Sequence, residues 1–374
     1  MLSLVTLNNF QIDPNRGFTS LQTVVSIDNS WSVDVDAPVI GKRIKKTLES
    51  PIDLEHGFLL RCHPYIFKSP NVGRESETLS EVLASYIGGD LLGLDIQRTY
   101  MATRATSSGN ETGVLMESFL KRPYLGALPL PRFGNYTSLT HGGTIINRIY
   151  PLFDHKRGDQ HSIRLIRRAT SGAENRYSIS HSAFVPYWAR LLAFDMLINN
   201  GDRHQENWGV VPYNWQNPNE QKYYKNELGQ FTPKPFYRFS PIYDNGGGFG
   251  SELDSKGLRK LVRNSNDDIL ATVTKYALKG RAHMGFEEVK AGSVSRKTLT
   301  FPELIKFFCD AYPIAKPIMK EISKVDLVKI EQALGFLKAR AVDLGIKDCE
   351  LRFNFILELI RFRRDELIQA LGNE

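Results

Sequence analysis

An apolar run that leads straight into a polar loop is the feature that most limits the folds open to this chain. Residues 187–198 carry apolar side chains nearly all round, which predicts a buried helix over residues 182–198. The loop that follows, residues 199–208, is rich in Asn and Gly, which favour turns and leave polar side chains free to face a ligand. Asp202 and Asn207 lie five residues apart in it. The pattern predicts a carboxylate and an amide held at the edge of a rigid core.

A second carboxylate, Asp244, follows the apolar segment 236–243 and enters a glycine run. Residues 208–213 and 236–243 are predicted strands joined by a polar surface insertion. An antiparallel return of the second strand would bring Asp244 beside Asn207. A carboxylate that orients an attacking hydroxyl, together with oxygen ligands for a magnesium ion, suits phosphoryl transfer. Asp202 fits the first role, and Asn207 and Asp244 fit the second.

In the N-terminal half, Lys68 ends the apolar segment 65–68, where a charge needs a partner if it is buried. The spacing of apolar residues predicts a helix over residues 77–92. Glu77 and Glu81 lie four residues apart on one face of it, so either carboxylate could pair with Lys68. The plainer alternative is an exposed lysine and two solvated acids.

Both acidic motifs resemble those of a known kinase family. Residues 201–207 read Gly-Asp-Arg-His-Gln-Glu-Asn, similar to the catalytic loop shared by phosphoinositide kinases and the bacterial HipA-like serine/threonine kinases. Residues 240–246 read Ser-Pro-Ile-Tyr-Asp-Asn-Gly, which is closer to the HipA-like form. The likeness is specific around these motifs and extends from about residue 64 to the C-terminal helices.

The resemblance implies an α+β, two-lobed protein-kinase-like fold with a small β-rich N-lobe and a mainly helical C-lobe. We expect residues 1–50 to form an N-terminal arm or extra strands, residues 51–120 the N-lobe and residues 121–374 the C-lobe. Apolar spacing independently predicts helices at residues 301–312, 317–322, 326–337 and 350–371.

The resemblance also implies roles for individual residues. Asp202 would be the catalytic residue, and Asn207 and Asp244 would hold Mg²⁺. The family comparison favours Glu81 over Glu77 as the partner of Lys68.

ATP is the implied cofactor beside Mg²⁺, and Lys68 would contact its phosphates. Glu117 and Phe119 lie where the two lobes of a kinase join, and their backbone would hydrogen-bond adenine. No Gly-x-Gly-x-x-Gly loop or Gly-x-x-x-x-Gly-Lys-Ser/Thr loop occurs in the sequence.

HipA-like proteins typically phosphorylate serine or threonine in proteins. Some act as toxins on translation components, next to a DNA-binding antitoxin. The resemblance therefore implies a protein substrate and an antitoxin-like partner for this chain.

The net charge and the cysteines limit the remaining classes of function and location. The net charge of +7 over 374 residues is compatible with anionic ligands, acidic partners or RNA, or simply with a basic surface. Cys62, Cys309 and Cys349 lack metal-ligand spacing and predict buried, reduced thiols in the cytoplasm. No apolar run approaches the roughly twenty residues that span a bilayer. Basic and aromatic residues do not interleave as in RNA-recognition modules, so we expect no direct nucleic-acid binding.

Four polar segments have plainer interpretations. Residues 41–47 place a glycine beside a basic cluster that could face phosphates, although a solvated basic turn is the default. Residues 154–168 predict a solvated loop. Residues 246–253 predict a flexible glycine segment in which Ser251 is a conceivable phosphorylation site. The arginines of residues 361–364 predict a solvated basic helix end.

Three other functions stay open at this point. A lipid kinase shares the catalytic-loop order, but the chain shows no amphipathic membrane-binding segment. A nucleotide-binding pseudokinase would act as an interaction module and would lack Mg²⁺-dependent ATP turnover. A basic RNA-binding protein would lose affinity steeply with salt, and ATP would leave its thermal stability unchanged.

Overall fold

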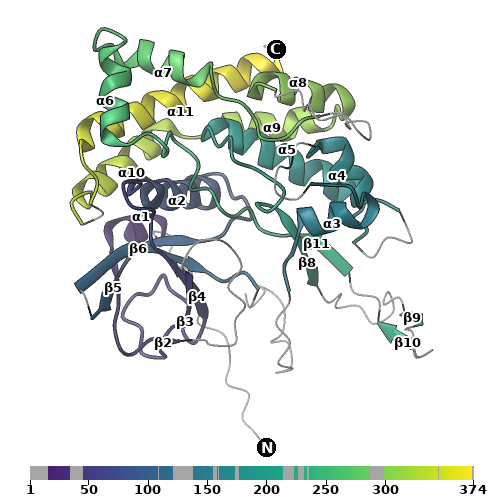
Figure 1. Cartoon of the computed structure of the whole chain (residues 1–374), viewed down its shortest axis with the longest axis horizontal. Helices are drawn as coiled ribbons and strands as arrows, with labels where there is room; N and C mark the ends of the chain where they lie inside the picture. Colours follow the sequence, from purple (N-terminus) through teal and green to yellow (C-terminus); the bar gives the residue numbers. More distant parts are fainter. Residues whose placement is uncertain are drawn as a thin grey trace, which may run out of the picture.

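The computed structural model consists of a β-rich lobe and a mainly helical lobe (Figure 1). It describes residues 16–33, 45–107, 109–120, 138–154, 158, 160–172, 177–213, 223–225, 231–233, 236–286, 299–343 and 345–372. The basic cluster of residues 41–47, which could face phosphates, is described only in part. Residues 41–44 lie outside the described residues, and residues 45–47 begin strand β3.

The N-lobe is built on a six-stranded sheet of order β1-β5-β6-β4-β3-β2. Only β1 and β5 pair in parallel. The strands are β1 (Val25–Ile27), β2 (Ser32–Val33), β3 (Lys45–Glu49), β4 (Pro64–Lys68), β5 (Thr99–Thr106) and β6 (Gly109–Glu117). Three of these strands, β1, β2 and β3, precede residue 51 and contribute to the same sheet. The lobe boundaries expected from the sequence stay a prediction.

Alternation along β4 decides where Lys68 points. Successive side chains of a strand face opposite sides of the sheet. Tyr65 and Phe67 belong to a core cluster on one side, whereas Ile66 packs against the main core on the other. Lys68 shares the face of Ile66 and therefore points toward helix α2.

Helix α2 (Ser76–Tyr86) lies between the sheet and the helical lobe (Figure 1). All its residues are buried, and it continues as a π-helical turn, η1 (Ile87–Leu91). Helices α1 (Arg16–Gln22) and α10 (Leu327–Ala339) pack against each other beside it. The Phe18 ring of α1 lies 5.5 Å from the Tyr86 ring and 5.6 Å from the Phe336 ring, measured between centroids. Both lobes thus enclose α2.

The helical lobe is organised around α5 (His181–Leu197), whose start is capped by the Ser180 hydroxyl accepting the Ala183 N–H. The other helices of this lobe are α3 (Gly142–Ile149), α4 (Ile163–Ala169), α6 (Ser255–Arg263), α7 (Ile269–Ala277), α8 (Phe301–Ala311), α9 (Ala315–Ser323) and α11 (Cys349–Leu371). The four C-terminal helices expected from apolar spacing are therefore present. Helices α6 and α7 were not predicted.

Short strands follow α5 and return the chain to the site. The antiparallel sheet β11-β8-β7 joins β7 (Thr140–His141), β8 (Gly209–Tyr213) and β11 (Phe236–Phe239). A separate hairpin pairs β9 (Tyr223–Lys225) with β10 (Phe231–Pro233). The pairing of β8 with β11 is the antiparallel return expected from the sequence.

Three predictions of solvated or flexible segments are wrong. The loop expected over residues 154–168 contains the start of α4, and its His161 is fully buried, where it accepts a hydrogen bond from the Trp208 indole at 2.9 Å. Arg363 is only 1% exposed. Residues 248–251 are buried against α2 and α11 rather than loose. Local polarity indicated solvent in each case, but packing from distant segments overrides it.

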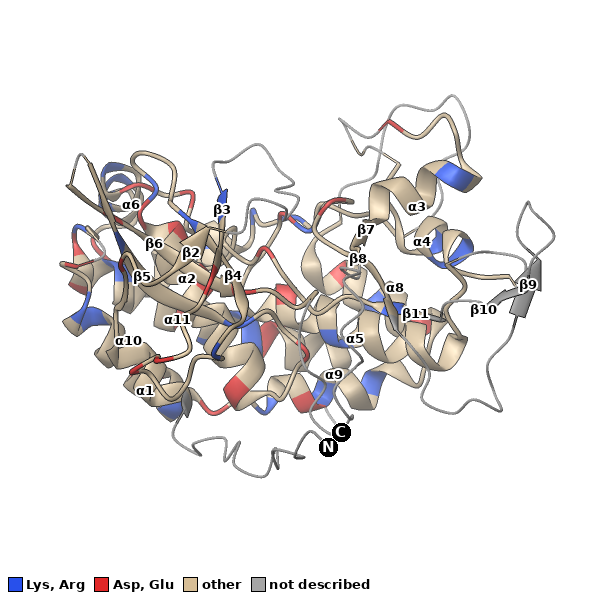
Figure 2. Ribbon diagram, turned by 90° about the horizontal axis from the view of Figure 1, so that it is seen from below, with Lys and Arg blue, Asp and Glu red and all other residues tan. Residues whose placement is uncertain are grey.

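Charge and hydropathy of the folded chain show no dominant feature. Basic and acidic residues are interspersed over both lobes in Figure 2. Within the described part of the chain, no helix combines the length and apolar character needed to cross a bilayer.

Candidate active site

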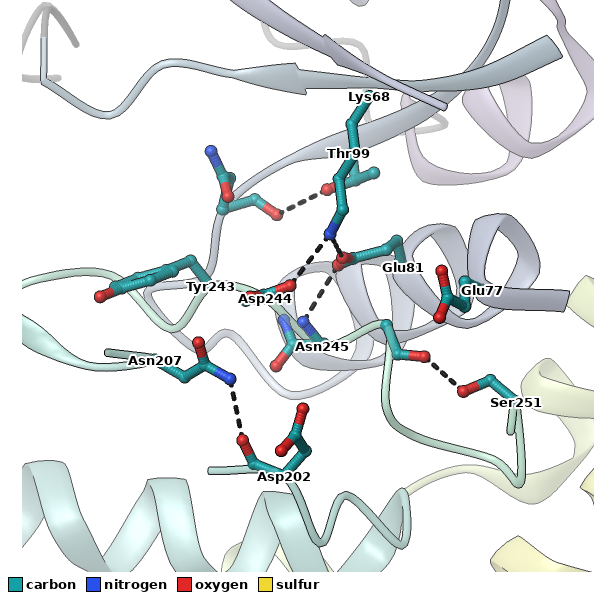
Figure 3. Close-up of polar contacts among 12 residues, drawn as sticks. Lys68, Glu77, Glu81, Thr99, Asp202, Asn207, Tyr243, Asp244, Asn245 and Ser251 are labelled. Carbon is teal, nitrogen blue, oxygen red and sulfur yellow. Dashed lines mark hydrogen bonds and ion pairs between the residues drawn. The ribbon is translucent and has the colours of Figure 1, made fainter. Parts of the chain in front are cut away.

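Lys68 lies at the centre of a buried ion-pair network between the two lobes (Figure 3). Its Nζ donates to Glu81 Oε1 at 2.8 Å and to Asp244 Oδ1 at 3.0 Å. Lys68 is 5% exposed and Glu81 3% exposed. Glu77, the alternative partner, lies 3.6 Å from the Arg74 guanidinium instead. The network thus joins a strand, a helix and a loop that are distant in sequence.

The two carboxylates keep Lys68 charged. Burial by itself lowers the pKa of the Lys68 ammonium, but Glu81 and Asp244 together outweigh burial, so its pKa lies above the ordinary value. The Asp244 side chain is 41% exposed. Its carboxylate is therefore held by a buried cation while part of the side chain faces solvent.

Asp244 has an unusual backbone conformation. Its φ of 55° lies in the left-handed region, which costs energy for any residue with a Cβ. Arg203 fixes the loop on the upstream side, because its Nη1 donates to the carbonyl oxygens of Tyr243 at 2.6 Å and Asn207 at 2.8 Å. Its Nη2 donates to Asn245 Oδ1 at 2.8 Å. One guanidinium thus links the loop of residues 199–208 to the segment that carries Asp244.

Arg203 is itself fixed by a buried carboxylate. Its Nε and Nη2 donate to the two oxygens of Asp195 at 3.0 and 2.8 Å, and both residues are buried. Asn200 Nδ2 also donates to Asp195, at 3.3 Å. The bidentate geometry holds the guanidinium in one orientation. Through this network Arg203 supports the loop of residues 199–208. Asp195 was missed, although a carboxylate inside an apolar helix was a detectable signal.

Asp202 and Asn207 lie on the side of Asp244 that faces away from Lys68 (Figure 3). Asp202 is exposed, and its backbone N–H donates to Asn200 Oδ1 at 3.2 Å. Asn207 Nδ2 donates to the Asp202 carbonyl at 2.8 Å. This bond directs the Asn207 amide oxygen away from that carbonyl, toward the side on which Asp244 lies (Figure 3). The three oxygen-bearing side chains expected from the sequence therefore gather in one place.

The glycine run is packed between the two halves of the site. A Cβ built on Gly246 would lie 3.0 Å from Glu81 Oε1. One built on Gly247 would lie 3.0 Å from Asn200 Oδ1 and 3.1 Å from Asp202 Cβ. These separations are tighter than ordinary side-chain contacts, so a Cβ at either position would push its neighbour aside by a few tenths of an ångström.

The two residues expected at the adenine end lie where β6 ends. The Glu117 N–H donates to the Arg98 carbonyl at 2.8 Å, and its carbonyl accepts from Gln97 Nε2 at 3.1 Å. The Phe119 ring lies 5.7 Å from the Tyr243 ring. Both backbone groups of Glu117 are thus engaged within the protein, and Phe119 packs beside the residue that precedes Asp244. Their roles toward a nucleotide stay predictions.

The donor set suits one class of metal ion. Among the described residues, no three His, Cys, Asp or Glu side chains cluster as a complete metal cage. Asp244 and Asn207 instead offer one exposed carboxylate and one fixed amide oxygen. Mg²⁺ is usually held this way, by one or two protein oxygens together with waters and substrate phosphates. The residues present therefore fit Mg²⁺ bound with a nucleotide.

Comparison with known proteins supports the architecture. No protein-family model and no curated protein sequence matches the chain. The solved structure of the Helicobacter pylori proinflammatory kinase CtkA is similar, with a TM-score of 0.63 and 14% identity over 93% of this chain and 97% of that chain. A chain of the Shewanella oneidensis MR-1 toxin–antitoxin complex of HipA, HipB and operator DNA aligns at a TM-score of 0.37 and 12% identity, over 96% of this chain and 70% of that one. A TM-score of 0.37 does not establish a common fold.

The similarity to CtkA shows that the chain has a kinase fold. The predicted α+β architecture, with a β-rich and a mainly helical lobe, is confirmed. At this level of identity the likeness concerns the fold, and any activity has to be argued from the site.

Proposed function

We propose that this chain is an ATP- and Mg²⁺-dependent kinase of the HipA-like type that transfers the γ-phosphate to a serine or threonine hydroxyl of a protein. The observation that carries the proposal is the junction at Asp244. Its carboxylate contacts Lys68, which is paired with Glu81, and Asp202 and Asn207 lie on the side of Asp244 away from Lys68 (Figure 3). An ion pair that only stabilises the fold would not need exposed carboxylates beside its buried cation.

Each side chain has a defined task in this proposal. Lys68, held charged and oriented by Glu81, neutralises the phosphates that are not transferred. Asp244 and Asn207 hold Mg²⁺, which supplies charge neutralisation at the phosphoryl oxygens. Asp202, which is exposed beside them, accepts a hydrogen bond from the substrate hydroxyl and aligns it for in-line attack.

Phosphoryl transfer from labelled ATP tests the proposal. The purified protein is incubated with Mg²⁺ and γ-labelled ATP, in parallel with Asp202→Ala and Asp244→Ala. Asp310→Ala serves as the matched control, because Asp310 is exposed on α8 away from the site. We expect the parent and Asp310→Ala to transfer label, at least to themselves, and the other two variants to transfer none.

The same assay separates the competing functions. Equal labelling by all four proteins would remove the site assignment. Binding of ATP without any transfer would favour a pseudokinase, and label that appears only in added phosphoinositide would favour a lipid kinase. Phosphoamino-acid analysis of the labelled protein tests the serine/threonine specificity.

The partner and the biological role are further parts of this proposal. They rest on the resemblance of the two motifs to HipA-like kinases, which implies an antitoxin-like protein partner and a toxin that acts on a translation component. Growth arrest on expression of the parent, absent with Asp202→Ala, would support the toxin role.

A further inference from the structure

One face of α2 is hydrogen-bonded to the segment that follows Asp244. Glu81 Oε2 accepts the Asn245 N–H at 3.0 Å, while its other oxygen contacts Lys68 (Figure 3). One residue earlier, the Ser80 hydroxyl donates to the Gly248 carbonyl at 3.0 Å. One helical turn before that, the Ser76 hydroxyl donates to the Ser251 carbonyl at 2.8 Å.

Both serine hydroxyls donate outside their own helix. A serine within a helix, such as Ser80, commonly bonds instead to the backbone of its own helix, four residues back. Ser80 is 1% exposed and Ser76 is also buried, yet both donate across to another segment. The Gly248 carbonyl also accepts the Ser251 N–H at 3.1 Å, so losing the Ser80 hydroxyl would remove the donor that comes from α2, at a place shielded from water.

The segment that receives these bonds begins at a strained residue. A left-handed backbone at a residue with a Cβ persists only where its surroundings hold it on both sides. Upstream of Asp244, Arg203 of the helical lobe binds the Tyr243 carbonyl at 2.6 Å. Downstream, the helical lobe holds the segment through Arg203 at Asn245 and through the Ile198 carbonyl at the Phe249 N–H. Helix α2 of the other lobe adds anchors through Glu81 and Ser80. The orientation of the Asp244 carboxylate therefore depends on α2 as well as on the loop.

We propose that Ser80, assisted by Ser76, is a positioning residue that holds Asp244 in the orientation needed to bind the metal. The inference rests on the proposed function for the identity of the metal and extends it to the control of that site. Helix α2 and residues 244–251 then move as one unit. A displacement of α2 would weaken metal binding as well as breaking the contact between Lys68 and Glu81.

A matched pair of variants on the same helix tests the proposal. Ser80→Ala removes the contact to residue 248. Ser85→Ala is the control, because Ser85 is also buried but its hydroxyl accepts the Thr99 N–H of the sheet, at 3.0 Å. Both variants lose one buried hydrogen bond of α2, and only Ser80→Ala loses one to the Asp244 segment.

The first measurement is amide hydrogen exchange of residues 245–251 in the protein without metal or nucleotide. We expect Ser80→Ala to raise exchange there about tenfold, as for the loss of one buried hydrogen bond. Ser85→Ala should leave exchange of this segment at the parent rate. Ser76→Ala, at the first residue of α2, is the second variant and should give a smaller change of the same kind.

The second measurement is the Mg²⁺ concentration that half-saturates the thermal stabilisation by ATP. We expect this concentration to rise several-fold in Ser80→Ala and to stay unchanged in Ser85→Ala. A merely structural role would lower the melting temperature of both variants without changing the Mg²⁺ dependence. Exchange and Mg²⁺ dependence like those of the parent in Ser80→Ala, or equal changes in Ser85→Ala, would overturn the inference.

The two proposals can fail separately. If the parent shows no Mg²⁺-dependent ATP stabilisation and no label transfer, the proposed function is wrong. Hydrogen exchange still decides in that case whether Ser80 holds the segment of Asp244, because it needs neither ligand.

Discussion

The ion pair between Lys68 and Glu81 provides the sharpest test of the site's energetics. We predict that Lys68→Met, which keeps most of the unbranched side chain and removes its charge, lowers the free energy of unfolding by about 3–5 kcal/mol. At an effective dielectric constant of about 20, two unit charges 2.8 Å apart attract by about 6 kcal/mol. Desolvation of both groups offsets part of this attraction. The loss nevertheless stays large, because Glu81 is 3% exposed and would be left as an unpaired buried carboxylate.

A double-mutant cycle isolates the pair. Glu81→Gln alone leaves Lys68 its contact with Asp244, so we expect a smaller loss. The double variant should lose at least about 1 kcal/mol less than the sum of the single variants, because no unpaired charge remains at position 81. Urea denaturation at pH 7 measures all four proteins. Lys46→Met, an exposed lysine on neighbouring β3, is the control and should change stability by less than about 0.5 kcal/mol.

The pH dependence of the pair follows from the direction of the shift. The pKa of Lys68 in the folded protein lies above its ordinary value of 10.5, so the stabilisation is complete at lower pH and is lost only as pH rises through the raised value. The difference in stability between the parent and Lys68→Met should therefore not shrink between pH 7 and pH 10. A loss below about 1 kcal/mol in Lys68→Met, as for a surface pair, or additive effects in the cycle would refute the reasoning.

Three further predictions concern residues around the site. Gly247→Ala should lower phosphoryl transfer about tenfold or more while the protein stays folded by circular dichroism, because the added Cβ meets Asp202 Cβ at 3.1 Å. Arg363→Met should reduce stability to urea by about 1–3 kcal/mol, because the buried Asn199 side chain loses this donor while the Ala277 carbonyl keeps the Gly280 N–H. Arg361→Met, two residues earlier at a half-exposed position, should have little effect. Burial lowers the pKa of His141 below its ordinary value of 6.5, so stability should fall as pH drops through 6.5, and His141→Gln should flatten that part of a melting-temperature profile. Unchanged activity, equal losses in the two arginine variants, or an unaltered profile would contradict these expectations in turn.

The parts of the site that were predictable depend on short stretches of sequence. Asp202 and Asn207 share one loop, and Asp244 follows a strand whose partner strand begins directly after that loop. Lys68 stood out as a charge at the end of an apolar strand, and helical spacing reduced its partners to Glu77 or Glu81. In each case the signal lies within one element or one hairpin.

The parts that were missed depend on contacts between distant elements. Arg363 occurs in a basic cluster near the end of the chain, yet it donates to the Asn199 side chain at 2.9 Å and to the Ala277 carbonyl at 2.7 Å. The spacing of apolar residues within α11 does not show that this helix packs against the end of α5. Ser80 carries no local signal for the same reason, because its partner, the Gly248 carbonyl, is 168 residues away. Burial of such groups is decided by tertiary neighbours rather than by local pattern.

A crystal structure with Mn²⁺ in place of Mg²⁺ and a non-hydrolysable ATP analogue tests the central claim most directly. The account predicts an anomalous manganese peak within ligand distance of both Asp244 and Asn207, with Lys68 on the phosphates and Asp202 facing the terminal one. A nucleotide bound elsewhere, or a manganese ion that contacts neither Asp244 nor Asn207, would contradict it.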